Sequence, residues 1–131
     1  MCWQPPSAGR VAAVRFGGLS QDIVSSANRT LRDSIESAFV EHPPLVYAAG
    51  HEHVLQVLRK SATSPWLLVS GAGAKTSCSV WMRESYYVGQ DGLGYMRLDL
   101  LRNRGVLLSV YRYSKAGAGG LVYSRWLEPR E

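Results

Sequence analysis

The sequence lacks several features that would define a protein class by themselves. No apolar run approaches the ~20 residues that a membrane-spanning helix needs, and the 131 residues contain no internal repeat. The two cysteines, Cys2 and Cys78, form no Cys-x-x-Cys pair. We therefore expect two reduced thiols rather than one disulfide. Histidine is also scarce, with three in the chain.

What is present fits one globular domain. The chain is 46% hydrophobic and 19% charged, and its length is enough to bury a core but short for a multidomain enzyme. Fifteen Lys and Arg against ten Asp and Glu give a net charge of +5. Such a charge suits anionic partners, either phosphorylated substrates or nucleic acid. Because the basic residues are scattered, an ordinary solvated surface explains them more simply.

The clearest periodicity predicts one amphipathic helix over residues 20–41. Ser20 is a good cap for its first turn, and Pro43-Pro44 stops it. Apolar residues recur at steps of four, at Ile23, Ala27, Leu31, Ile35 and Phe39, and Val24 and Ala38 add steps of three.

After the helix the period changes to two, which predicts strands. We expect strands at 45–49, 54–59, 66–69, 78–81, 95–101, 106–113 and 121–127. One helix followed by six to seven strands makes the fold class α+β, with the helix packed on a largely antiparallel or mixed sheet. Residues 1–19 form an irregular N-terminal segment, and residues 128–131 form a tail.

A short histidine motif separates the first two predicted strands. Residues 50–53 read Gly50-His51-Glu52-His53, between the apolar runs Leu45–Ala49 and Val54–Leu58. Two imidazoles projected from one turn can reach one metal ion or a close pair. On composition alone, a polar turn explains the motif equally well. The third histidine, His42, lies at the end of the predicted helix, where a cation interacts well with the helix dipole, and we assign it a structural role.

A second motif, Gly71-Ala72-Gly73-Ala74-Lys75-Thr76-Ser77, is similar to a phosphate-binding loop. The spacing argues against that function. With Lys75 as the loop lysine, glycine would be needed at positions 74 and 69, which hold Ala74 and Val69. A tight turn at the end of a strand is the better interpretation.

Taken together, residues 45–77 resemble the last conserved block of the calcineurin-like metallophosphoesterases. In that family a buried strand delivers Gly-His-x-His to a binuclear metal centre. A later strand commonly ends in a turn similar to Ser70-Gly71-Ala72-Gly73. The resemblance extends more loosely over residues 20–127, which suit the C-terminal half of the family's α/β/β/α sandwich. We therefore expect 20–127 to be a partial phosphoesterase domain.

The resemblance implies a metal site with specific ligands. His51 and His53 would each bind one divalent ion, Fe, Mn or Zn, with Gly50 permitting the turn and Glu52 without a role. In such centres, metals about 3.5–4 Å apart polarise a phosphoryl oxygen and supply a hydroxide. The implied reaction is hydrolysis of a phosphate-ester substrate.

The other blocks of the family are absent from this sequence. It contains no Asp-x-His and no Asn-His pair, which in the family supply the bridging carboxylate, the asparagine and the general acid. We therefore assign no catalytic residue and expect incomplete metal binding and negligible turnover. The chain is expected to correspond to the C-terminal portion of such a domain, truncated or degenerate. Its exposed apolar surface would favour self-association.

A different function class also fits the composition, namely a small basic β-rich module that binds nucleic acid or protein. Aromatic residues stand beside arginines at Tyr95/Arg97, at Tyr111-Arg112-Tyr113 and at Tyr123/Arg125/Trp126. Bases stack on such rings beside cations in single-strand binding. Ordinary cross-strand packing explains the aromatic residues more simply.

Overall fold

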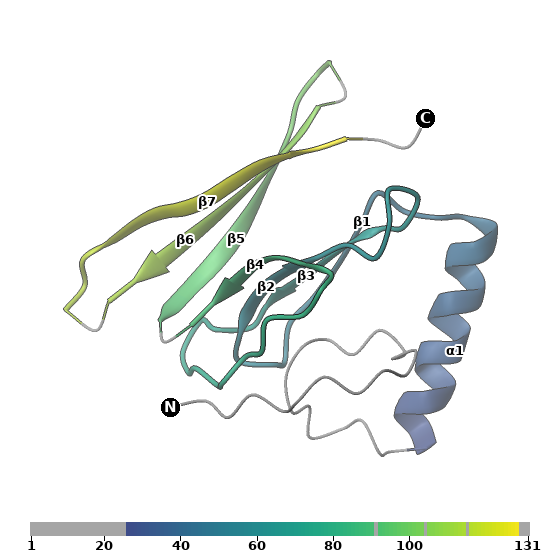
Figure 1. Cartoon of the computed structure of the whole chain (residues 1–131), viewed down its shortest axis with the longest axis horizontal. Helices are drawn as coiled ribbons and strands as arrows, with labels where there is room; N and C mark the ends of the chain where they lie inside the picture. The colour runs from purple at the N-terminus through teal and green to yellow at the C-terminus, as the bar shows by residue number, and fades with distance from the viewer. Residues whose placement is uncertain (1–25, 91, 104, 115, 129–131) are drawn as a thin grey trace.

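The computed structural model describes residues 26–90, 92–103, 105–114 and 116–128. In these residues one helix precedes seven strands, which confirms the α+β class (Figure 1). The elements are α1 (Ser26–Glu41), β1 (Val46–Ala49), β2 (Leu55–Leu58), β3 (Trp66–Ser70), β4 (Ser85–Gly89), β5 (Leu93–Leu100), β6 (Val106–Tyr113) and β7 (Gly119–Leu127). The predicted segment 1–19, the predicted helix start at Ser20 and the end of the tail lie outside the described residues.

The strands form two sheets, one mixed and one antiparallel. A four-stranded mixed sheet has the order β1-β3-β2-β4, in which only β1 and β3 are parallel. The other sheet is the antiparallel meander β5-β6-β7. Each sheet takes its strands from one continuous part of the sequence after the helix, β1 to β4 for the first sheet and β5 to β7 for the second.

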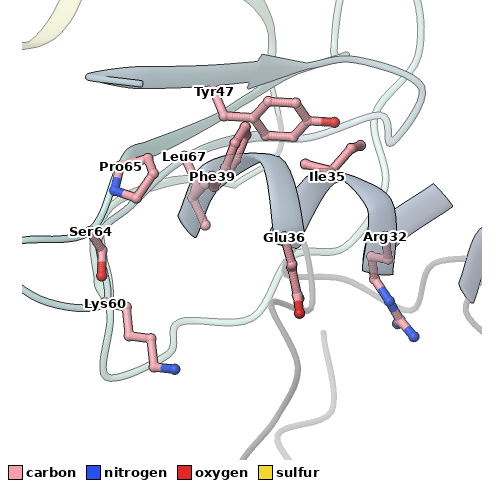
Figure 2. Close-up of a pocket in the computed structure, with 9 residues that line it drawn as sticks. All are labelled: Arg32, Ile35, Glu36, Phe39, Tyr47, Lys60, Ser64, Pro65 and Leu67. Atoms are coloured by element: carbon pink, nitrogen blue, oxygen red, sulfur yellow. The ribbon is translucent and has the colours of Figure 1, made fainter. Parts of the chain in front are cut away.

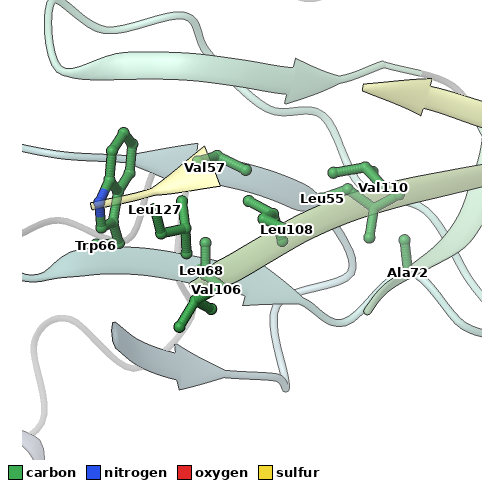
Figure 3. Packing of buried hydrophobic residues seen from close by; sticks show 9 residues of the cluster. All are labelled: Leu55, Val57, Trp66, Leu68, Ala72, Val106, Leu108, Val110 and Leu127. Atoms are coloured by element: carbon green, nitrogen blue, oxygen red, sulfur yellow. The ribbon is translucent and has the colours of Figure 1, made fainter. Parts of the chain in front are cut away.

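The core lies between the two sheets (Figure 3). Its buried side chains come from β2, β3, β6 and β7 and from the loop after β3, and they are Leu55, Val57, Trp66, Leu68, Ala72, Val106, Leu108, Val110 and Leu127. Two hydrogen bonds tie the sheets across this interface. The amide of Met96 donates to Ser70 Oγ at 3.1 Å, and the amide of Gly94 donates to the Ala72 carbonyl at 2.9 Å.

Helix α1 covers part of the opposite face of the four-stranded sheet. Tyr47 and Leu67 are partners in the β1–β3 register, and both face away from the core because strand side chains alternate. Phe39 meets Tyr47 edge to face, with ring centroids 5.3 Å apart. Within the described part of the predicted apolar stripe, Leu31 is 60% exposed.

One predicted strand is wrong, and one real strand was missed. Residues 78–81 are not a strand. Hydrogen bonds that involve side chains, rather than backbone pairing with a neighbouring strand, hold this segment in place. Ser79 Oγ donates to the Gly89 carbonyl at 3.2 Å, and Gln56 Nε2 donates to the Val80 carbonyl at 3.3 Å. The missed strand is β4, which pairs with β2.

The expectations about the cysteine thiols and about membrane spans can both be compared with the structure. Cys78 is disulfide-bonded, so the prediction of two reduced thiols is wrong; the other cysteine lies outside the described residues. Among the described helices, none has the length and apolar character needed to cross a membrane.

Candidate metal-ligand turn

The histidine motif occupies the turn that leaves the carboxyl end of β1. Since β1 and β3 run parallel, their carboxyl ends meet at the same edge of the sheet. The turn at 50–53 follows β1, and the glycine-containing loop at 71–77 follows β3. Open sheets with parallel strands commonly bind ligands outside these carboxyl ends.

The backbone of the motif folds into two consecutive three-residue turns. The amide of Glu52 donates to the Gly50 carbonyl at 2.9 Å, and the amide of Val54 donates to the Glu52 carbonyl at 2.7 Å. The first turn is centred on His51, whose φ is 71°. A γ-turn with a positive central φ is rare and strained. His51 is the one non-glycine residue in the described chain with a positive φ.

Glycine is required in this region at position 71 rather than at position 50. Gly50 does not have a positive φ, and a Cβ added there would meet no atom within 4 Å. A Cβ on Gly71 would overlap the carbonyl oxygen of Glu52. The sequence signalled Gly71 only as part of a glycine-rich turn, and its contact with Glu52 comes from the fold.

Main-chain hydrogen bonds join the two motifs. The amide of Gly71 donates to the Val54 carbonyl at 3.1 Å, and the amide of Ser77 donates to the His53 carbonyl at 2.8 Å. The Gly-His-x-His turn and the Ser-Gly-Ala-Gly turn are therefore neighbours in space. Together they form one hydrogen-bonded stretch of backbone that carries both histidines.

The donor set at this turn is small. His51 is exposed and His53 is half-buried. No three His, Cys, Asp or Glu side chains are grouped to hold a metal ion anywhere in the described part of the chain. His42 does not join the pair, because it precedes the amino end of β1 whereas His51 follows its carboxyl end.

Part of the aromatic and basic set forms a cluster on the outer face of the three-stranded sheet. Tyr95 on β5 stacks with two tyrosines of β6, with centroids 5.1 Å from Tyr111 and 6.1 Å from Tyr113 and interplanar angles of 14° and 21°. Arg97 covers Tyr111 at 5.4 Å and pairs with Asp99 at 2.9 Å. A hydrogen bond with the Tyr113 hydroxyl raises the pKa of Tyr95. The rings stack on one another and Arg97 lies over Tyr111, so part of the ring surface on which a base would stack is already covered.

The remaining members of that set serve packing. Tyr123 lies against Tyr87, with ring centroids 5.2 Å apart. Arg125 lies 5.1 Å from the ring of the buried Trp66 and 4.6 Å from that of Tyr86. Arg112 donates to the Gln90 carbonyl. Trp126 is the exception in this set, because it is 53% exposed.

The pairing of two imidazoles with a glycine-rich neighbouring turn is the strongest site-like feature in the described residues. Comparison of the chain with models of known protein families, with curated proteins and with solved structures found no match.

Proposed function

We propose that this chain carries the metal-ligand block of a metal-dependent phosphoesterase of the calcineurin-like type, with His51 and His53 as the ligands. One observation carries the proposal. The histidine turn rests directly on Gly71, at the shared carboxyl edge of β1 and β3. The two segments whose sequences resemble the family block are thus hydrogen-bonded to each other.

The strain at His51 adds support. A non-glycine residue with φ of 71° costs on the order of 1–3 kcal/mol, and such residues cluster at functional sites. Histidine tolerates this region better than most residues, but a turn without a function gains nothing from the strained backbone at His51. Metal ligation would make use of a histidine whose backbone position is fixed in this way.

The donors present do not fit a complete binuclear centre. Two neutral imidazoles bring no negative charge, and the described residues supply no grouped carboxylate. Catalytic zinc sites, for comparison, usually have three protein ligands. We therefore derive no hydrolytic step from this chain, and we propose that it holds one divalent ion weakly and hydrolyses phosphate esters only when further ligands are added.

The test is a titration of the purified chain with Co²⁺ or Zn²⁺, followed by absorbance or calorimetry. Wild type should bind one ion, and His51→Ala and His53→Ala should each weaken binding by at least 10- to 100-fold, the range seen when even outer-shell partners are lost. His42→Ala is the matched control, because His42 is exposed and lies at the other end of β1. It should bind as wild type does.

Two results would contradict the proposal. Equal affinity in wild type and in the His51 and His53 variants would exclude these ligands. Steady, metal-dependent hydrolysis of an aryl phosphate by the chain alone, lost in His51→Ala, would show that the centre is complete after all.

The nucleic-acid alternative gains no comparable support. Its best surface is the Tyr95 cluster, in which the rings lie against each other and Arg97 is already paired with Asp99. We therefore do not develop it further.

A further inference from the structure

A second site lies between α1 and the four-stranded sheet, away from the histidine turn. It is a pocket of about 120 Å³ (Figure 2). Its walls come from α1, from β1 and β3, and from the loop at 60–65 that precedes β3. None of these residues belongs to the motif at 50–53.

The interior of the pocket is apolar and has the size of one aromatic ring. Ile35, Phe39, Tyr47, Pro65 and Leu67 line it. An engineered protein cavity of about 150 Å³ with a similar lining stays dry and binds benzene. A pocket of 120 Å³ is therefore close in size to a single phenyl ring or a branched aliphatic group.

The rim of the pocket is charged, with an excess of positive charge. Arg32, Glu36 and Lys60 line the opening, and Figure 2 shows their charged groups on the side away from the Tyr47 ring. Within the part of the chain that the structure describes, no ion pair neutralises either cation. Two cations against one carboxylate favour an anionic group at the mouth.

The loop that carries one wall is held in place before any ligand arrives. Arg59 donates through Nε to the Ser64 carbonyl at 3.2 Å and through a terminal nitrogen to the Ala62 carbonyl at 2.5 Å. The hydroxyls of Ser61 and Ser64 are 2.8 Å apart. Lys60 and Pro65, at the two ends of this loop, therefore project from a preformed support, which lowers the ordering cost of binding.

We propose that this pocket binds a small carboxylic acid whose apolar part is one aromatic ring or a branched aliphatic group of that size. The apolar group enters between Phe39 and Leu67. The carboxylate stays at the rim beside Lys60 and Arg32. The inference is independent of the proposed phosphoesterase function, since Tyr47 and Leu67 lie near the amino ends of β1 and β3, opposite the histidine turn.

The experiment follows amide chemical shifts of the intact chain on titration with three probes. These are phenylacetate, toluene as the apolar part alone, and acetate as the anionic part alone. Phenylacetate should shift signals of Phe39 and Leu67 and bind more tightly than either part. Arg32→Gln and Lys60→Gln should each weaken phenylacetate about two- to five-fold, as expected of a partly exposed charge pair, and leave toluene unchanged.

Matched variants separate the pocket from general surface effects. Arg29→Gln changes the same residue type on the same helix without touching the pocket, and should bind phenylacetate as wild type does. Ile35→Trp fills the pocket from the helix side and should abolish binding of both phenylacetate and toluene. His53→Ala should bind phenylacetate normally, which separates this proposal from the metal site.

The proposal fails if phenylacetate produces no shifts in folded wild-type protein at millimolar concentration. It also fails if Ile35→Trp still binds the probes, or if Arg29→Gln weakens phenylacetate as much as Arg32→Gln does.

Discussion

At the scale of single residues, His51 is the position where sequence and backbone conflict. Its φ of 71° lies in a region where a Cβ is disfavoured, at a cost of on the order of 1–3 kcal/mol. The tight turn around it explains the conflict, because consecutive hydrogen bonds from Glu52 to Gly50 and from Val54 to Glu52 leave the backbone little freedom. His53, in the second turn, has no positive φ.

This contrast predicts opposite responses to glycine at the two histidines. The free energy of unfolding of His51→Gly should be roughly 1 kcal/mol higher than that of His51→Ala, because glycine accepts the left-handed region without strain. At His53 the order should reverse, with glycine roughly 0.5–1 kcal/mol less stable than alanine. Urea unfolding of the four variants measures both differences. The same sign at both positions would show that the turn relaxes when the imidazole at position 51 is removed.

At the scale of elements, the connection after β1 and the connection after β3 behave as one unit. Gly71 is the point of closest approach, where its α-carbon faces the carbonyl oxygen of Glu52. Hydrogen bonds from Gly71 to Val54 and from Ser77 to His53 lie on either side of that approach. A side chain at position 71 must therefore push the histidine turn away.

Gly71→Ala should lower the free energy of unfolding by about 1–3 kcal/mol, the usual cost of forcing an extra methyl group into a packed site. It should also weaken metal binding, since the turn that holds His51 and His53 moves. Gly73→Ala is the control from the same loop, because a Cβ at Gly73 meets nothing within 4 Å and its φ is not positive. We expect it to change stability by less than about 0.5 kcal/mol. Wild-type stability of Gly71→Ala would contradict this description of the loop contact.

The elements also show what the sequence could predict. The predicted strand 95–101 alternates apolar and polar residues, and all of it except Leu101 lies in β5 (Leu93–Leu100). β4 has the sequence Ser-Tyr-Tyr-Val-Gly, which lacks such alternation and therefore predicts no strand. Residues 78–81 have strand-like composition, yet contacts from distant residues such as Gln56 hold them out of the ladder. Such long-range contacts leave no local pattern.

The site was predictable to a similar degree. The two histidines and the glycine-rich loop were recognisable as motifs, and the parallel pairing of β1 with β3 makes them neighbours. The strain at His51 and the contact at Gly71 depend on the path of two connections, which no residue spacing encodes. The pocket beside α1 was equally hidden, because it needs residues from three separate segments.

At the scale of the whole molecule, the two sheets share one core, so each depends on the other. Leu108, on the central strand β6, has no exposed surface and packs with residues of both sheets. Leu121, on β7, is 54% exposed. The two leucines therefore offer a buried and an exposed version of the same substitution.

Other large apolar side chains are also exposed, including Val40 at 84% and Leu100 at 78%, and self-association through such residues stays a prediction.

Leu108→Ala should lower the free energy of unfolding by about 2–5 kcal/mol, the usual cost of a cavity in a packed core. Leu121→Ala should cost less than about 0.5 kcal/mol. Because the core is shared, circular dichroism and tryptophan fluorescence should report one coincident transition in Leu108→Ala. Two separated transitions would show that the sheets fold independently.

The division of the sheets along the chain also orders events during synthesis. The four-stranded sheet is complete at Gly89, whereas the strands that cover its core face run from Leu93 to Leu127. At about 5–20 residues per second, a ribosome needs roughly 2–7 s to add them. During that interval Leu55, Val57, Trp66 and Leu68 have no second sheet over them. We expect chaperones that hold apolar strands to bind the nascent chain during this interval, and a pause in translation after Gly89 would lengthen its exposure.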